Sequence, residues 1–136
     1  MIALARKSEV SQDDYDEAEI SVEPEKSQRA SFIVESHRIE TVNLEDDKIL
    51  KKLVLEGRIP EIERKINVSD VRIAIGEKIV FSGLWVELDE HKKLKFGVLS
   101  RLLKVAGLNK IKDLDGREFP ICRDQGKYWA IDVCRM

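Results

Sequence analysis

A short amphipathic stripe predicts the most definite element of this chain. Four apolar residues follow one another at intervals of three and four positions: Leu99, Leu102, Leu103 and Ala106. This spacing places them on one face of an α-helix. Gly107 can adopt the left-handed conformation that ends many helices, and Leu108 is the apolar residue that often follows such a cap. The pattern therefore predicts a helix that ends at Gly107 and buries one face.

The stripe lies inside a block of positive charge. Between His91 and Lys112 the chain has no Asp or Glu, and its cationic residues are Lys92, Lys93, Lys95, Arg101, Lys104, Lys110 and Lys112. Lysine and arginine neutralise phosphates and release counterions, so a continuous cationic surface binds nucleic acid whatever its sequence. We expect these residues to form such a surface. The alternative is that these charges only form an ordinary solvated surface. Arg101 and Lys104 lie opposite the apolar stripe, where any soluble helix would carry charged residues.

The segment before this helix has the alternating pattern of β-strands. Apolar residues recur at every second position in 71–75 and again in 79–81, and Gly76-Glu77 marks a tight turn between the two runs. Gly83 indicates a bulge or bend. Beyond it, the alternation places Trp85 on the face opposite the apolar residues, which predicts an exposed ring.

Two further elements are expected nearer the N-terminus. Residues 30–43 predict one or two short strands, with His37 in a polar turn between them. Asn43 is a plausible N-cap for a first helix, whose first turn would contain the acidic residues 45–47 and which would end at Gly57. The buried stripe of that helix would consist of Ile49, Leu50, Leu53 and Val54.

The chain is expected to close with a hairpin formed by residues 117–122 and 128–134. Placing the apolar residues of both strands on one face sets Ile121 opposite Trp129. That register leaves residues 124–126 as a three-residue loop, a favoured hairpin type.

The same register bears on the two cysteines. Cys122 would lie opposite Tyr128, about 20 Å from Cys134 at the usual rise of a strand, so the two cannot form a disulfide within the hairpin. They also form no CxxC pair, and with only two histidines in the chain we expect no metal site.

The order strands, helix, strands, helix, hairpin predicts an α+β fold. We expect a small curved antiparallel sheet or an OB-like β-barrel with two helices and a C-terminal hairpin. The alternative is an open antiparallel sheet with both helices on one face. A chain of 136 residues suits one such domain, placed at residues 29–136.

Residues 1–28 are expected to form an acidic, mostly disordered tail. Residues 1–25 contain two basic and eight acidic side chains, a net charge of −6, whereas the remaining residues contain 22 basic and 18 acidic ones, a net charge of +4. Few apolar residues are present in the tail to offset its ordering entropy. Such a tail either keeps the protein in solution or competes with polyanions for the basic surface of the same chain.

Recognisable enzyme motifs are missing from the sequence. It contains no GxxxxGK[ST] loop, GxGxxG, GxSxG elbow or HExxH, so we expect a protein that is not an enzyme and that needs no cofactor. No apolar run approaches the length of a membrane span, and we expect a cytoplasmic protein, in the host cytoplasm if the chain is viral. Gln and Asn total six while Lys and Glu are abundant, a balance common in proteins from hot environments.

Aromatic residues extend the nucleic-acid hypothesis to single strands. Exposed rings stack on unpaired bases, and the strand pattern leaves Trp85 and Tyr128 facing away from the core. The alternative class is a protein-interaction adaptor, possibly a homodimer, in which Trp85 lies in an interface. A third class is an enzyme whose site leaves no linear motif.

Four segments, taken in order, resemble a known class of proteins: GLWVELD, KFGVLSRLLKVAGL, IKDLDGREFPI and YWAIDV. A strand, a Leu-rich helix, a D-L-x-G-[KR] turn and a closing hairpin follow one another similarly in phage and archaeal-virus single-stranded DNA-binding proteins with an OB-like fold. The resemblance covers about residues 76–134 and implies single-stranded DNA as the partner. The acidic tail of this chain is N-terminal, whereas that of familiar bacterial single-strand binders is C-terminal.

Overall fold

The computed structural model describes residues 11–18, 27–124 and 128–136. Its main element is a curved, mostly antiparallel sheet of eight strands. The strands are β1 (Ser27–Asn43), β2 (Ile49–Ile59), β3 (Arg64–Val68), β4 (Asp70–Ile75), β5 (Lys78–Gly83), β6 (Trp85–Val86), β7 (Glu118–Asp124) and β8 (Trp129–Asp132). The helices are α1 (Gln12–Glu17) and α2 (Val98–Val105), with short 3-10 turns η2 (Glu45–Asp47), η3 (Ile111–Leu114) and η4 (Val133–Arg135). The predicted α+β class with a curved antiparallel sheet is confirmed.

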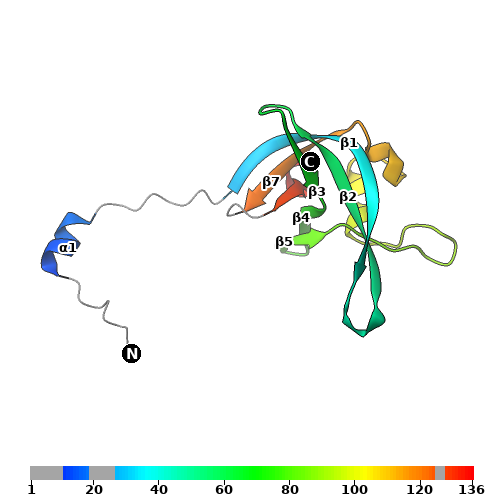
Figure 1. Cartoon of the computed structure of the whole chain (residues 1–136), viewed down its shortest axis with the longest axis horizontal. Helices are drawn as coiled ribbons and strands as arrows, with labels where there is room; N and C mark the ends of the chain where they lie inside the picture. Colours follow the sequence, from blue (N-terminus) through cyan, green and yellow to red (C-terminus); the bar gives the residue numbers. More distant parts are fainter. Residues whose placement is uncertain (1–10, 19–26, 125–127) are drawn as a thin grey trace.

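Hydrogen-bonded neighbours follow the order β3-β2-β1-β7-β8-β4-β5, and β4 and β8 form a parallel pair. The short strand β6 follows β5 after Leu84 and pairs with β2, near the other end of this order. Leu84 strengthens this return, because its N–H donates to the Ser69 carbonyl and its own carbonyl accepts from the Leu53 N–H. The chain therefore returns from β5 to β2 through β6, while the sheet itself is curved (Figure 1) and unclosed, with β3 and β5 at its two ends.

Helix α2 packs its predicted stripe into the core of this sheet. Leu99, Leu102 and Leu103 are buried and belong to one cluster with strand residues such as Phe32 and Ile131. Burying each such side chain contributes about 1.5–3 kcal/mol. The predicted helix is therefore confirmed.

The end of α2 is also as predicted. Gly107 has a φ of 74°, its N–H donates to the Lys104 carbonyl, and the Leu108 N–H donates to the Leu103 carbonyl. These two bonds satisfy carbonyls that the last turn would otherwise leave unpaired.

The first helix expected after Asn43 is absent, and this prediction is wrong. Residues 43–49 form the turn of a long hairpin between β1 and β2, which pair from Ile33–Arg58 to Asn43–Ile49. Asp46 and Asp47 have φ values of 67° and 59°, a left-handed conformation that Asp tolerates, so the acidic residues form a turn and do not cap a helix.

Pairing across the sheet explains this error. A helix at residues 43–57 would leave the backbone of the C-terminal half of β1 without its hydrogen-bond partner, because that half pairs with β2. The hairpin extends beyond the rest of the sheet (Figure 1). Of the predicted helical stripe, Leu53 and Val54 are buried, while Ile49 and Leu50 are exposed near the tip of the hairpin.

Strand β1 is also longer than predicted, and His37 lies within it rather than in a turn. The His37 Nδ1 atom is 2.8 Å from the Asp115 Oδ1 atom, in the turn before β7. This contact connects β1 to the turn between η3 and β7. The predicted turn at Gly76-Glu77 is confirmed between β4 and β5.

The register predicted for the last hairpin is wrong by two residues. Ile121 lies opposite Ile131, and Cys122 lies opposite Ala130. A shift of two keeps every side chain on its predicted face, so Ile121 and Ile131 are buried as expected. The connection is correspondingly longer than the predicted loop at 124–126, most of which lies outside the described residues. Both cysteines are free, as predicted.

Part of the predicted disordered tail has a regular structure. Residues 12–17 form α1, where the Ser11 hydroxyl accepts from the Asp14 N–H and the Asp14 carboxylate accepts from the Ser11 N–H. This reciprocal pair satisfies two backbone donors at the start of the helix. None of its residues is buried. Ser27 and Gln28, which the prediction also assigned to the tail, belong to β1. The other residues of the predicted tail, 1–10 and 19–26, lie outside the described residues.

Candidate functional site

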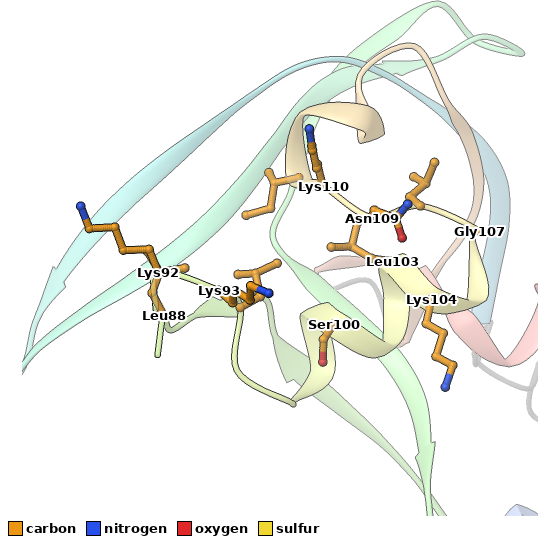
Figure 2. A pocket seen from close by; sticks show the side chains of 12 residues that line it. Leu88, Lys92, Lys93, Ser100, Leu103, Lys104, Gly107, Asn109 and Lys110 are labelled. Atoms are coloured by element: carbon orange, nitrogen blue, oxygen red, sulfur yellow. The ribbon is translucent and has the colours of Figure 1, made fainter. Parts of the chain in front are cut away.

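An open groove of about 990 Å³ lies beside α2. One wall is the loop before the helix, the second is α2 itself, and the third is the segment from Gly107 to η3 (Figure 2). The lining residues are Leu88, Lys92, Lys93, Leu94, Ser100, Leu103, Lys104, Gly107, Leu108, Asn109, Lys110 and Ile111. We call this the basic groove, because four of the seven predicted cationic residues line it.

The loop wall is a tight, hydrogen-bonded turn. The Asp89 carboxylate accepts from the backbone N–H groups of His91 and Lys93, at 2.8 and 2.9 Å. The Asp89 N–H donates to the Lys93 carbonyl, and Lys92 has a φ of 61°, the conformation of the last residue in a three-residue hairpin loop. Asp89 therefore holds the loop that presents two lysines, and its carboxylate bonds to backbone rather than to their ammonium groups.

The opposite wall depends on the start and end of α2. The Ser100 hydroxyl accepts from the Gly97 N–H at 2.8 Å, which begins the helix, and the Gly107 cap ends it. Lys104 lies in the last turn and Lys110 just before η3. Leu103 and Leu108 also line this part of the groove, which gives it an apolar component.

No carboxylate side chain lines the basic groove among the residues that the structure describes. In the same part of the chain, none of the four lining lysines has a carboxylate ion-pair partner. Figure 2 shows Lys92 and Lys104 extending away from each other on opposite sides of the groove, with Lys93 between them. Amino groups spread in this way suit a polymer with several negative charges better than one small anion.

The other three predicted cationic residues lie outside the groove. Lys95 forms an ion pair with Glu87 at 2.6 Å, and this hydrogen bond raises the pKa of Lys95. Arg101 donates to the Ala74 carbonyl at 2.8 Å and so ties α2 to the end of β4. Lys112 is exposed in η3. The structure thus separates the seven residues into a groove-lining set and a set with other contacts.

Trp85 and Tyr128 are both exposed, at 42% and 76%. Trp85 has the Lys52 ammonium 5.2 Å from its ring centre. It lines a small hollow of about 140 Å³, here called the aromatic hollow, together with Gly83, Glu87, Leu94, Lys95, Phe96, Gly97, Val98 and Leu99. Tyr128 lines neither the aromatic hollow nor the basic groove.

Sequence reasoning missed Phe96, which is 89% exposed and lines the same hollow as Trp85. Its position three residues before Leu99 suggests an extension of the apolar stripe. Gly97 begins the helix after Phe96, so the ring lies outside the helical face. The signal that the sequence offered was an aromatic residue between Lys95 and Gly97, just before the helical pattern begins.

Neither a family model, nor a curated protein, nor a solved structure matches the chain. Among the described residues, no three His, Cys, Asp or Glu side chains gather into a possible metal site. No described helix has the length and apolar character to cross a membrane. The fold and site therefore define an α+β protein whose curved sheet carries a cationic groove beside one helix.

Proposed function

We propose that this protein binds single-stranded nucleic acid along the basic groove, without catalysing a reaction. The observation that carries the proposal is the gathering of four lysines without carboxylate partners around one open groove. Each ammonium would neutralise a phosphate and release a counterion. The apolar lining and the nearby exposed Trp85 favour a single strand, because unpaired bases offer apolar faces to such surfaces.

The sheet supports the finer proposal of an OB-like barrel. Its order runs from β2 through β1, β7, β8 and β4 to β5, and β6 then returns to β2. A partly open barrel of this kind is a frequent scaffold for oligonucleotide binding. Two free thiols fit the reducing cytoplasm of a cell or of an infected host, which is the compartment we propose.

Charge reversal at one groove lysine tests the proposal. We expect Lys104→Glu to weaken binding of a labelled single-stranded oligonucleotide in fluorescence anisotropy. The slope of log K against log salt should fall in magnitude by about 0.7 or more, the value for one phosphate contact on a single strand.

Lys48→Glu is the matched control, because it makes the same charge change in an exposed turn residue outside the groove. It should change the affinity much less. Equal weakening by both variants would show that net charge alone governs binding, and affinity indifferent to salt would contradict the proposal as a whole.

A homodimeric adaptor is the second candidate, favoured by one observation. The protruding β1–β2 hairpin exposes Ile39, Leu44, Ile49 and Leu50. Apolar side chains gathered on a projecting element are typical of a protein interface. Sedimentation at micromolar concentration separates the candidates: a dimer that does not respond to salt or to oligonucleotide favours the adaptor.

A further inference from the structure

The aromatic hollow differs from the basic groove in its charge. Its charged lining residues are Lys95 and Glu87, and these two pair with each other at 2.6 Å. The hollow thus has no net charge from its lining, whereas the lysines of the groove have no carboxylate partners in the described part of the chain. An uncharged group therefore fits the hollow, and negative groups fit the groove.

Trp85 is held in place before any ligand binds. Lys52 lies over its ring and also pairs with Asp70 at 3.4 Å. Gly83 leaves room for the indole, because a Cβ at that position would come within 2.9 Å of the Trp85 Nε1 atom. A ring fixed in this way loses little conformational freedom when it stacks, so more of the contact energy appears as affinity.

Phe96 has the opposite character, because it is 89% exposed and contributes almost nothing to the core. A large apolar side chain held in water has no stabilising role in the folded chain. Phe96 lines a hollow of about 140 Å³ together with Trp85, where its ring is open to a ligand. This hollow is smaller than the roughly 300 Å³ of the smallest typical small-molecule pockets, so it suits one planar group.

The hollow and the groove are neighbours that share one lining residue. Leu94 lines both, and the loop that contains it carries Lys92 and Lys93 on the groove side and leads to Phe96 on the hollow side. A chain of phosphates in the groove can thus place an attached base in the hollow.

We propose that Trp85 and Phe96 form a stacking subsite for one base of the bound strand, whose phosphates lie in the basic groove. This inference rests on the proposed function. It assigns base recognition to the aromatic hollow and phosphate recognition to the lysines. Tyr128, expected from the sequence as a second stacking ring, lies outside this subsite.

The test compares two ligands of equal length and charge, an oligothymidylate and an abasic phosphodiester oligomer, on the full chain. Phe96→Ala should bind oligothymidylate about tenfold more weakly, about 1.4 kcal/mol, and bind the abasic oligomer as the wild type does. Phe96→Tyr keeps an aromatic ring and should bind both ligands normally. Because Phe96 is exposed, its replacement does not threaten folding.

Tyr128→Ala is the matched control, since it removes another highly exposed ring from outside the hollow, and it should leave both affinities unchanged. Wild-type binding with no preferential loss in Phe96→Ala, or an equal loss in Tyr128→Ala, overturns the inference and leaves the proposed function intact. A wild-type protein that binds neither oligomer overturns the proposed function and this inference with it.

Discussion

Gly57 of β2 lies opposite Val34 of β1. A Cβ at this position would overlap with the backbone carbonyl of Ile33, beside the irregular pairing between Val34 and Ser36. The sequence pattern indicated a helix end here, where Gly would supply a left-handed conformation. In the structure Gly57 instead leaves space for the β1 backbone, to which β2 is held by hydrogen bonds.

We therefore expect Gly57→Ala to lower the free energy of unfolding by about 3 kcal/mol, because backbone must shift to admit the methyl group. Urea denaturation followed by circular dichroism measures this. Gly76→Ala is the comparison: nothing lies within 4 Å of its Cβ, and its φ of 62° costs only about 1–2 kcal/mol of strain. Similar losses at both glycines would mean that the close approach of the strands is unimportant.

The two cysteines differ in reactivity. Burial, followed by the negative charge of Asp132, raises the pKa of the Cys122 thiol to about 11, and Cys134 is exposed. Since the thiolate is the reactive form, iodoacetamide at about pH 8 should label Cys134 alone in the folded protein and both cysteines in denaturant. Intact mass measurement counts the labels, and Cys134→Ser should remain unlabelled when folded. Rapid double labelling of the folded chain would contradict the burial of Cys122.

The same pKa shift makes stability depend on pH. Below the ordinary thiol pKa both folded and unfolded states hold the proton, and Cys122 contributes its full stability. As the pH rises from about 9 to about 11, the unfolded chain releases the proton first and the free energy of unfolding should fall. Cys122→Ala should lose part of this alkaline decline in thermal melts. An identical decline in the variant and the wild type would assign it to other groups.

At the scale of elements, α2 shows how two glycines at its ends serve different purposes. Gly107 has a φ of 74°, which suits glycine, whereas Gly97 has a φ of 178°, extended backbone that any residue adopts. Nothing lies within 4 Å of a Cβ at either position. The two sites thus differ in backbone conformation and share open surroundings.

Gly107→Ala should therefore lower the free energy of unfolding by about 1–2 kcal/mol, the cost of a left-handed alanine, while Gly97→Ala should change it by less than about 0.5 kcal/mol. Thermal denaturation of the two variants measures the difference. Equal effects would show that the cap does not adopt the conformation described.

Periodicity predicted some elements well and others badly. Helix α2 and the β4–β5 hairpin have clean periods with a turn residue at the boundary, and both were predicted correctly. Residues 49–59 fit a helix by their spacing and a strand by their partners. These residues form a strand because they pair with β1. A helix at the same residues would leave the N–H and C=O groups of the facing part of β1 without hydrogen-bond partners.

For the whole molecule, the uneven distribution of charge is the main feature. Residues 1–25 have a net charge of −6, and the rest of the chain has +4. Within the tail, α1 buries none of its residues, and the sheet begins at Ser27. Removal of residues 1–25 therefore takes away negative charge that repels a polyanion and leaves the described core unchanged.

Deletion of residues 1–25 should tighten oligonucleotide binding, most strongly at low salt, and change the melting temperature little. Anisotropy titrations and thermal melts of the two chains measure these effects. Unchanged affinity would mean that the tail serves only to keep the protein in solution. A large loss of melting temperature would show that the tail packs on the sheet.

The sequence by itself determined the elements whose pattern is local: the helix that ends at Gly107, the turn at Gly76-Glu77, the free thiols, and a cationic block without carboxylates. Tertiary structure alone decided that residues 49–59 are a strand, that the last hairpin is shifted by two residues, and that four of seven cationic residues share a groove. Only the fold placed Phe96 beside Trp85 in one hollow. The physical reason is range, because periodicity and turn chemistry act between neighbours along the chain, whereas strand pairing and groove formation depend on contacts between residues far apart in it.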